Sequence, residues 1–262
     1  MRHNPPQSGN ILFLILLAII LFVALSYAVN SGMRGGGKDA GNEKNSLSYS
    51  GILQSASLME NSLNRMMLTN GCKENELSFE DPYDIGYTNN TRADGTCKLF
   101  GNLGGGVEYP VPDTSWLESS HAAKGNYRKW VFFNITCVPY IGTGGGSCAN
   151  QGGTSDSDLV VFLPYVTKAI CQAINDTIAV PATSDGDVQI ESANTDVDQG
   201  WYKYIGAFSG PGGTDSITGS TANGGLINAF YGKRYGCFKR DPTTYPSDNP
   251  AVYVFYQVLL AR

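Results

Sequence analysis

Residues Ile11–Leu25 read ILFLILLAIILFVAL and contain no charged or polar side chain. The uncharged stretch extends over residues 10–33, and Ile11–Val29 alone supplies nineteen mostly apolar residues. A helix needs about 20 such residues, at a rise of about 1.5 Å each, to cross a bilayer core of about 30 Å. The segment therefore predicts a membrane helix, with Tyr27 as an aromatic anchor at the interface.

Two other interpretations of this segment stay open. Ser26-Tyr27-Ala28 resembles the small-residue site at which a signal peptide is cleaved, although Leu25 and Tyr27 fit poorly with the polar end of such a peptide. The segment is also long enough for a buried core helix. Nineteen apolar residues so near a terminus argue against that reading.

The rest of the chain differs in composition from this N-terminal part. All six Cys and all three Trp lie beyond residue 70, Gly reaches 32 residues, and charged residues make up 16 %. We expect one globular α+β head over 72–262, large enough to bury a core. The net charge of −5 argues against a nucleic-acid partner. The one tight basic cluster, Lys233, Arg234, Lys239 and Arg240, indicates a solvated turn.

Before the head, the sequence predicts a stalk of several parts. We expect a leader over 1–9, the apolar membrane or filament-core helix over 10–33, a glycine hinge over 34–40 and an amphipathic helix over 41–71. Gly35-Gly36-Gly37 predicts the hinge, since each glycine costs about 1 kcal/mol relative to alanine inside a helix. Asn70-Gly71 is a typical helix stop.

The amphipathic helix carries a heptad-like stripe of residues spaced three and four apart. This stripe packs either on the head of the same chain or on neighbouring subunits, and the sequence leaves both alternatives open. Its members are Tyr49, Ile52, Ala56, Met59, Leu63 and Met66.

The head shows three strand-like runs and one helical pattern. The strands are expected over Trp130–Val138, Asp158–Leu163 and Ala251–Leu260. A helix is expected after Pro164, because Val166, Ile170, Ile174 and Ile178 follow at helical spacing.

The six cysteines predict three disulfides, because none has the CxxC or CxH spacing of a metal site. Among fifteen connectivities, we favour Cys72–Cys97, Cys137–Cys148 and Cys171–Cys237. Disulfides place the head outside the cytoplasm. The charge rule for membrane proteins favours the opposite orientation, since only Arg2 precedes the apolar segment whereas Arg34, Lys38 and Lys44 follow it.

Sites for chemistry are scarce in this sequence. Only His121 could serve a catalytic triad within the head, and nothing around it resembles a nucleophile elbow, so we expect a surface histidine and no enzyme. The glycine runs at 104–106 and 142–146 lack phosphate-loop spacing. Asp185, Asp187 and Glu191 suggest a calcium site, the alternative being a solvated acidic loop. We expect no other cofactor.

The start of the chain resembles type IV pilins and pseudopilins. A short leader ending in Gly9 is followed by Asn10 and the apolar run, then a second helix and a disulfide-bearing head. The resemblance implies cleavage after Gly9, residence in the inner membrane before assembly, and packing of the apolar helix against other copies or other pilin-like subunits. The residues implied in assembly are Ile11, Phe13, Leu14, Ala18 and Phe22. Leu14 departs from the pattern, since pilins usually carry Glu at that place.

The sequence therefore predicts a structural subunit of an extracellular filament or pseudopilus that displays its head at the cell surface. The alternative is a membrane-tethered or secreted adhesin that binds glycans or surfaces through exposed Trp116, Trp130 and Trp201.

Overall fold

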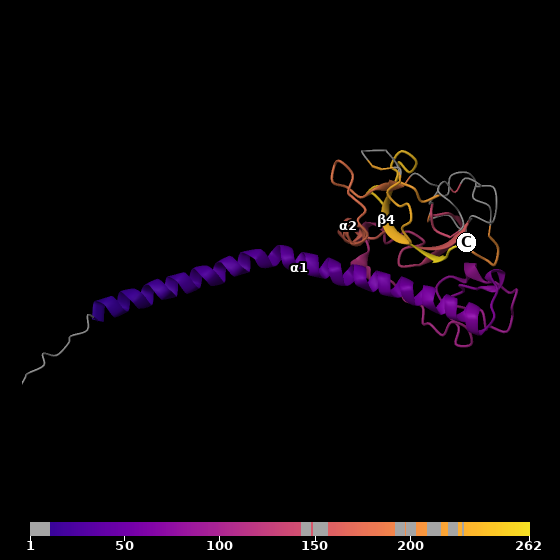
Figure 1. The fold of residues 1–262 in the computed structure, drawn as a ribbon, viewed down its shortest axis with the longest axis horizontal. Coiled ribbons are helices and arrows are strands. Elements are labelled where there is room, and N and C mark those ends of the chain that lie inside the picture. The colour runs from indigo at the N-terminus through magenta and orange to yellow at the C-terminus, as the bar shows by residue number, and fades with distance from the viewer. Residues whose placement is uncertain are drawn as a thin grey trace, which may run out of the picture. The chain divides into compact units, whose positions relative to one another are not determined.

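A computed structural model describes residues 11–142, 148, 157–191, 197, 203–208, 216–219, 225–226 and 228–262 (Figure 1). The side chains of residues 11, 12, 14, 28–40, 42 and 85 lie outside this description. The chain divides into two units, Met1–Lys44 and Asn45–Arg262. The second unit has the mixed helix and sheet content of an α+β head, as the sequence predicts.

Helix α1 runs from Ile11 to Thr69 without interruption. The backbone is therefore helical through the glycines of residues 34–40, and a hinge at this point stays a prediction. Each glycine weakens a helix by about 1 kcal/mol. Nucleating a second helix is also unfavourable, whereas continuing one already formed adds a hydrogen bond for each residue fixed.

The predicted stop of α1 is confirmed. Gly71 adopts a φ of 64°, and the amide of Asn70 donates to the carbonyl of Met66 over 3.0 Å. A left-handed residue just past the last turn is the usual way a helix ends.

Where side chains are described, no helix combines the length and the apolar character that crossing a membrane requires. The sequence predicts such a helix over 10–33, and that part of the expectation is not confirmed.

The stripe of α1 packs on the head of its own chain. Its described members Ile52, Ala56, Met59 and Leu63 have no exposed surface, and Met66 is also buried. They belong to the single core cluster of the second unit, and Tyr49 packs against it while partly exposed. Packing within the chain is therefore the correct alternative for these residues, and packing on neighbouring subunits is wrong for them.

Five strands form one sheet in the order β1-β2-β5-β4-β3. Their bounds are β1 Val131–Thr136, β2 Asp158–Pro164, β3 Ile190–Glu191, β4 Tyr235–Arg240 and β5 Tyr253–Leu260. Neighbouring strands pair antiparallel except for β3 and β4, which are parallel. The three strands predicted from the sequence correspond to β1, β2 and β5, whereas β3 and β4 were not predicted.

Helix α2, Lys168–Thr177, packs beside β4 (Figure 1). Thr167 caps it by accepting a hydrogen bond from the amide of Ile170, and Ile170, Cys171 and Ile174 are buried. The predicted helix is thus present, although it begins after Val166 because Pro164 ends β2. Four short 3-10 turns complete the described elements: η1 Glu74–Glu76, η2 Ile85–Tyr87, η3 Thr114–Trp116 and η4 Ser119–His121.

Groups from outside the sheet pair with two backbone positions that have no strand partner on one side, one on β4 beyond the end of β3 and one on the edge strand β1. On β4, the side-chain amide of Asn175 both accepts from the amide of Cys237 over 2.9 Å and donates to its carbonyl over 2.7 Å. On β1, the backbone N–H of Phe132 donates to the hydroxyl of Tyr87, and its carbonyl accepts from the amide of Tyr204. Exposed edges would otherwise offer these groups to another chain.

The three predicted disulfides are all confirmed. Cys72 is bonded to Cys97, Cys137 to Cys148, and Cys171 to Cys237. Disulfides persist in oxidising compartments, so they favour a location outside the cytoplasm.

Candidate functional site

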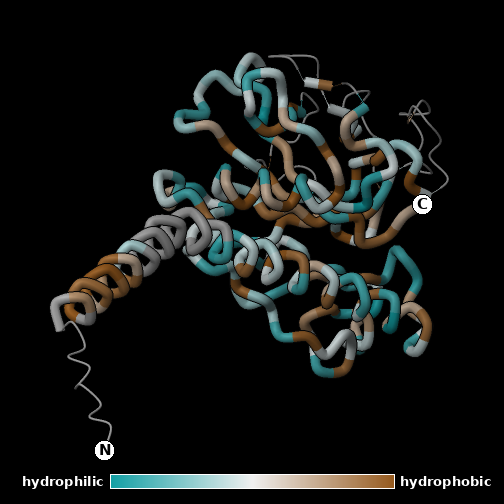
Figure 2. Tube along the Cα trace, turned by 60° about the vertical axis from the view of Figure 1, so that its left-hand side comes forward, coloured by the Kyte–Doolittle hydropathy of each residue, from teal (hydrophilic) through white to brown (hydrophobic). Residues whose placement is uncertain are grey.

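The N-terminal part of α1 leaves large apolar side chains uncovered. Every described large side chain between Phe13 and Tyr27 is exposed, from 44 % at Leu17 to 76 % at Tyr27. Figure 2 shows this part of α1 as a hydrophobic stretch. Single exposed apolar residues are normal on proteins, but a contiguous apolar surface marks a site of interaction. We call residues 13–27 the apolar segment of α1.

Three of the five residues implied in assembly can be placed on this surface. Phe13, Ala18 and Phe22 are exposed. The side chains of Ile11 and Leu14 lie outside the described residues, as do Gly9 and Asn10 at the implied cleavage site.

The three carboxylates of the predicted calcium site do not converge. Both oxygens of Asp187 are taken up by lysines: Lys168 lies 2.9 Å from one and Lys239 lies 2.7 Å from the other. Glu191 is buried in β3 and accepts from the backbone amides of Thr218 and Gly219. Asp185 accepts from the hydroxyl of Thr183. Among the described residues no acidic, histidine or cysteine cluster could hold a metal ion.

These contacts fix the charge of Asp187. Burial alone would raise its pKa, but hydrogen bonds from Lys239 and Lys168 outweigh burial and lower the pKa to about 2. The hydroxyl of Tyr253 and the backbone N–H of Val188 also donate to the same carboxylate. Asp187 therefore joins α2, β4 and β5 as an ionised group.

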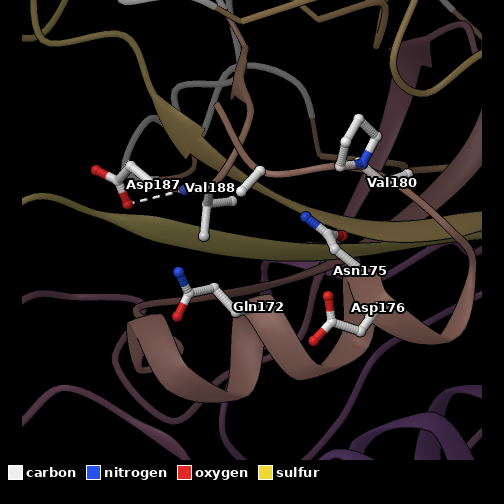
Figure 3. Close-up of a pocket in the computed structure, with 8 residues that line it drawn as sticks. Gln172, Asn175, Asp176, Val180, Asp187 and Val188 are labelled. Carbon is white, nitrogen blue, oxygen red and sulfur yellow. Dashed lines mark hydrogen bonds between the residues drawn. The ribbon is translucent and has the colours of Figure 1, made fainter. Parts of the chain in front are cut away.

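A pocket of about 170 Å³ lies beside α2, and every residue that lines it is described. Gln172, Asn175 and Asp176 of α2 face Val180, Asp187 and Val188 across it (Figure 3). Sites for drug-sized ligands are larger, about 300–1,000 Å³. Gln172 donates to the carbonyl of Gly186, and the side-chain amide of Asn175 donates to the carbonyl of Cys237 on β4. Since these groups serve the fold, the pocket gives no ligand class.

His121 is buried, contrary to the surface position predicted for it. His121 is the last residue of η4, and the centroid of its ring lies 5.0 Å from that of the Tyr165 ring. The ring therefore packs against an aromatic neighbour, while its buried Nε2 has no hydrogen-bond partner among the described residues.

The tryptophans proposed as an exposed binding surface do not form one. Trp130 is buried, and its indole N–H donates to the carbonyl of Pro110 over 2.7 Å. Trp116 is partly buried against Gly51 of α1, and Trp201 lies outside the described residues.

The basic cluster is also bound into the fold instead of forming a solvated turn. Arg234 pairs with Glu60 of α1 over 2.8 Å, and Arg240 pairs with Asp248 over 3.3 Å. The ammonium of Lys233 donates to the carbonyl of Ile178 over 2.7 Å. The sequence missed these roles because every partner lies far along the chain or in a segment without a local pattern.

Asp158, a buried carboxyl, is the first residue of β2. One oxygen accepts from the amide of Val138 over 2.9 Å, and the other accepts from the amide of Arg262 over 3.0 Å. Burial raises its pKa to about 6, against the effect of these two hydrogen bonds and of the nearby arginines 234 and 262. No sequence pattern singled it out, since a lone Asp before an apolar run is common.

Comparison of the chain with protein-family models, curated proteins and solved structures finds no match.

Proposed function

We propose that this protein is a structural subunit of a pilus-like extracellular filament or pseudopilus. In this proposal the apolar segment of α1 packs against the same segment of other copies or of related subunits. The head of residues 72–262 is then displayed outside the cytoplasm. No catalytic step is assigned to the protein.

The exposure of the apolar segment is the observation that carries this proposal. Its large side chains, from Phe13 to Tyr27, are at least 44 % exposed in the isolated chain. A helix that is apolar on all sides needs either lipid or equally apolar neighbours around it. A filament subunit uses lipid before assembly and its neighbours afterwards.

The part of α1 from residue 45 onward has a different role from the apolar segment. Its apolar stripe is already buried in the head, so it holds the head to the helix. Glu60 adds polar contacts to this attachment, with Arg234 at 2.8 Å and Gln257 at 2.6 Å. The apolar segment remains the surface available for other subunits.

The test is a charge placed in the apolar segment. We expect Ala18→Asp to abolish filaments in electron micrographs of the native host, because an unpaired buried carboxylate costs several kcal/mol. Gln54→Asp is the matched control, since Gln54 is an exposed residue of α1 beyond the apolar segment. Filaments that persist with Ala18→Asp, or a native protein found only as membrane monomers, would contradict the proposal.

The proposed processing is tested separately by sequencing the N-terminus of the mature protein. Cleavage after Gly9 gives a chain that starts at Asn10. A start at Met1 indicates an uncleaved anchor, and a start at Val29 indicates a signal peptide. Either of these two results would favour the tethered or secreted adhesin, which a glycan array would then examine.

A further inference from the structure

The three disulfides differ in how well the fold protects them. Cys72 retains 4 % of its surface exposed, whereas the other five cysteines have no exposed surface. Exchange begins when a thiolate reaches a disulfide sulfur, so access is the first requirement. By this criterion Cys72 is the cysteine nearest to solvent, so the Cys72–Cys97 bond is the first candidate for exchange.

The other half of the same disulfide lies beside a fixed positive charge. The guanidinium Nη1 of Arg92 lies 3.6 Å from the sulfur of Cys97 and also donates to the carbonyl of Asn70 over 3.1 Å. Asp94, at 3.2 Å, and Glu76, at 3.7 Å, hold the guanidinium in place and also offset part of its charge. A neighbouring arginine stabilises a thiolate, and a more stable thiolate leaves faster during exchange.

Neither of the other disulfides combines these two properties. The described hydrogen bonds and ion pairs place no other arginine or lysine nitrogen against a cysteine sulfur. The Cys171–Cys237 bond is further enclosed by Asn175, which binds the backbone of Cys237 on both sides.

We propose that Cys72–Cys97 is a site of thiol–disulfide exchange, with Cys72 as the attacked sulfur and Cys97 as the leaving group. The co-reactant is a dithiol, either a small molecule or a protein dithiol. Arg92 is a positioning and charge-stabilising residue for the leaving sulfur.

The exchange takes two balanced steps. A thiolate of the dithiol forms a bond to the sulfur of Cys72 while the Cys72–Cys97 bond breaks, and Cys97 departs with the electron pair as a thiolate beside Arg92. The second thiolate of the reagent then attacks its own sulfur in the mixed disulfide and releases Cys72 as a thiolate. The protein gains two electrons, and the dithiol becomes a disulfide.

Other contacts keep the surrounding segment in place when this bond opens. The amide of Ser78 donates to the carbonyl of Cys97, and the amide of Leu99 donates to the carbonyl of Ser78, both over 2.9 Å. The side-chain amide of Asn89 also donates to the carbonyls of Asn75 and Leu77. The site therefore acts as a local tether at the end of α1 and not as the sole support of the head.

The first measurement is the order in which the three disulfides open. Folded protein is treated with dithiothreitol, and samples are quenched in acid, alkylated and mapped by mass spectrometry over time. We expect label on Cys72 and Cys97 before label on the other four cysteines. Earlier opening of Cys137–Cys148 or Cys171–Cys237 would overturn the proposal.

The second measurement identifies the attacked sulfur. Brief exposure to glutathione, followed by acid quenching, traps the mixed disulfide. We expect the glutathione adduct on Cys72 and a free thiol on Cys97. An adduct found mainly on Cys97 would contradict the assigned direction.

The third measurement separates the charge of Arg92 from its structural contacts. A less stable leaving thiolate departs more slowly, so loss of the arginine charge beside Cys97 should slow exchange at this bond. We expect this slowing for Arg92→Gln and a rate close to native for Arg92→Lys. A merely loosened fold would speed reduction of this bond and of Cys171–Cys237, so acceleration, or an unchanged rate, in Arg92→Gln contradicts the proposed role.

Discussion

The carboxylate of Asp187 connects α2, β4 and β5 through polar contacts. Its contacts with Lys239 and Lys168, at 2.7 and 2.9 Å, are made only by the ionised form. Lys239 is largely buried but Lys168 is about half exposed, so solvent screens part of the interaction. Acidification should therefore weaken the head at this point.

We expect Asp187→Asn to lower the free energy of unfolding by about 1–2 kcal/mol at pH 7. Because the folded-state pKa is lowered to about 2, the native advantage is complete above about pH 4 and is lost as the pH falls toward 2. Urea unfolding of both proteins at pH 7, 4 and 2.5 measures this gap. Asp185→Asn, in the exposed part of the same loop, should change stability by less than about 0.5 kcal/mol. A gap that is constant with pH would contradict the ion-pair account.

Asp158 has the opposite dependence on pH. Its folded-state pKa is raised to about 6, so the folded protein holds this proton more tightly than the unfolded chain does. The contribution of Asp158 therefore falls as the pH rises from about 4 to about 6, by up to about 3 kcal/mol. The Asp158→Asn variant has no titrating carboxyl at this position, so it lacks this dependence on pH.

We expect the stability of native protein minus that of Asp158→Asn to decrease by up to about 3 kcal/mol between pH 4 and pH 7. Urea unfolding across this range measures the difference. The difference in stability between native protein and Asp187→Asn serves as the reference, because it should stay constant between pH 4 and pH 7. If Asp158→Asn keeps the native slope between pH 4 and 6, another group is responsible.

At the scale of elements, Gly51 shows how closely the head approaches α1. A Cβ at this position would lie 2.7 Å from Cζ2 of Trp116, whereas at Gly41 it would meet nothing within 4 Å. Alanine favours a helix by about 1 kcal/mol, but forcing a rigid indole ring to move costs about 1–3 kcal/mol. The net effect of alanine on stability therefore differs between Gly51, where the indole ring must move, and Gly41, where nothing must move.

We expect Gly51→Ala to lower the unfolding free energy of the head by about 1 kcal/mol and to shift tryptophan fluorescence. Gly41→Ala, the matched control, should leave the unfolding midpoint unchanged and raise helix content slightly in circular dichroism. Equal midpoints for both variants would mean that the indole moves aside without cost.

The elements that sequence reasoning found are those with a local pattern. The stripe from Ile52 to Met66 repeats at helical spacing, and β5 is a run of large apolar residues. Strand β4 was missed because the basic residues at both of its ends, from Lys233 to Arg240, indicate a turn. Their partners Glu60 and Asp187 lie far from them in the chain, and only the folded sheet brings these charges together.

The same limit explains the errors at the predicted sites. Asp185, Asp187 and Glu191 have a spacing that suits a cation, but lysines from α2 and β4 neutralise Asp187 first. Glycine content predicts a hinge at residues 34–40, and the backbone there is helical, so bending at this point stays a prediction. The Cys72–Cys97 and Cys137–Cys148 pairs each close a turn-rich or glycine-rich loop that the sequence shows, whereas no local pattern singles out Cys171–Cys237.

At the scale of the whole molecule, the apolar side chains fall into two groups, one buried in the core and one exposed on α1. The core cluster of residues 45–262 holds one shared set of buried side chains from α1, α2 and the sheet. The apolar segment of α1 belongs to residues 1–44 and is exposed instead. A change within the segment should therefore alter association while leaving the melting temperature of the head unchanged.

The covered edges of the sheet matter most where many copies are crowded together. At Cys237 and Phe132, backbone groups that could nucleate cross-β growth are occupied by the chain's own side chains and segments. In the proposed filament, neighbouring heads would find the backbone groups of Cys237 and Phe132 already paired, so these two positions could not start cross-β growth.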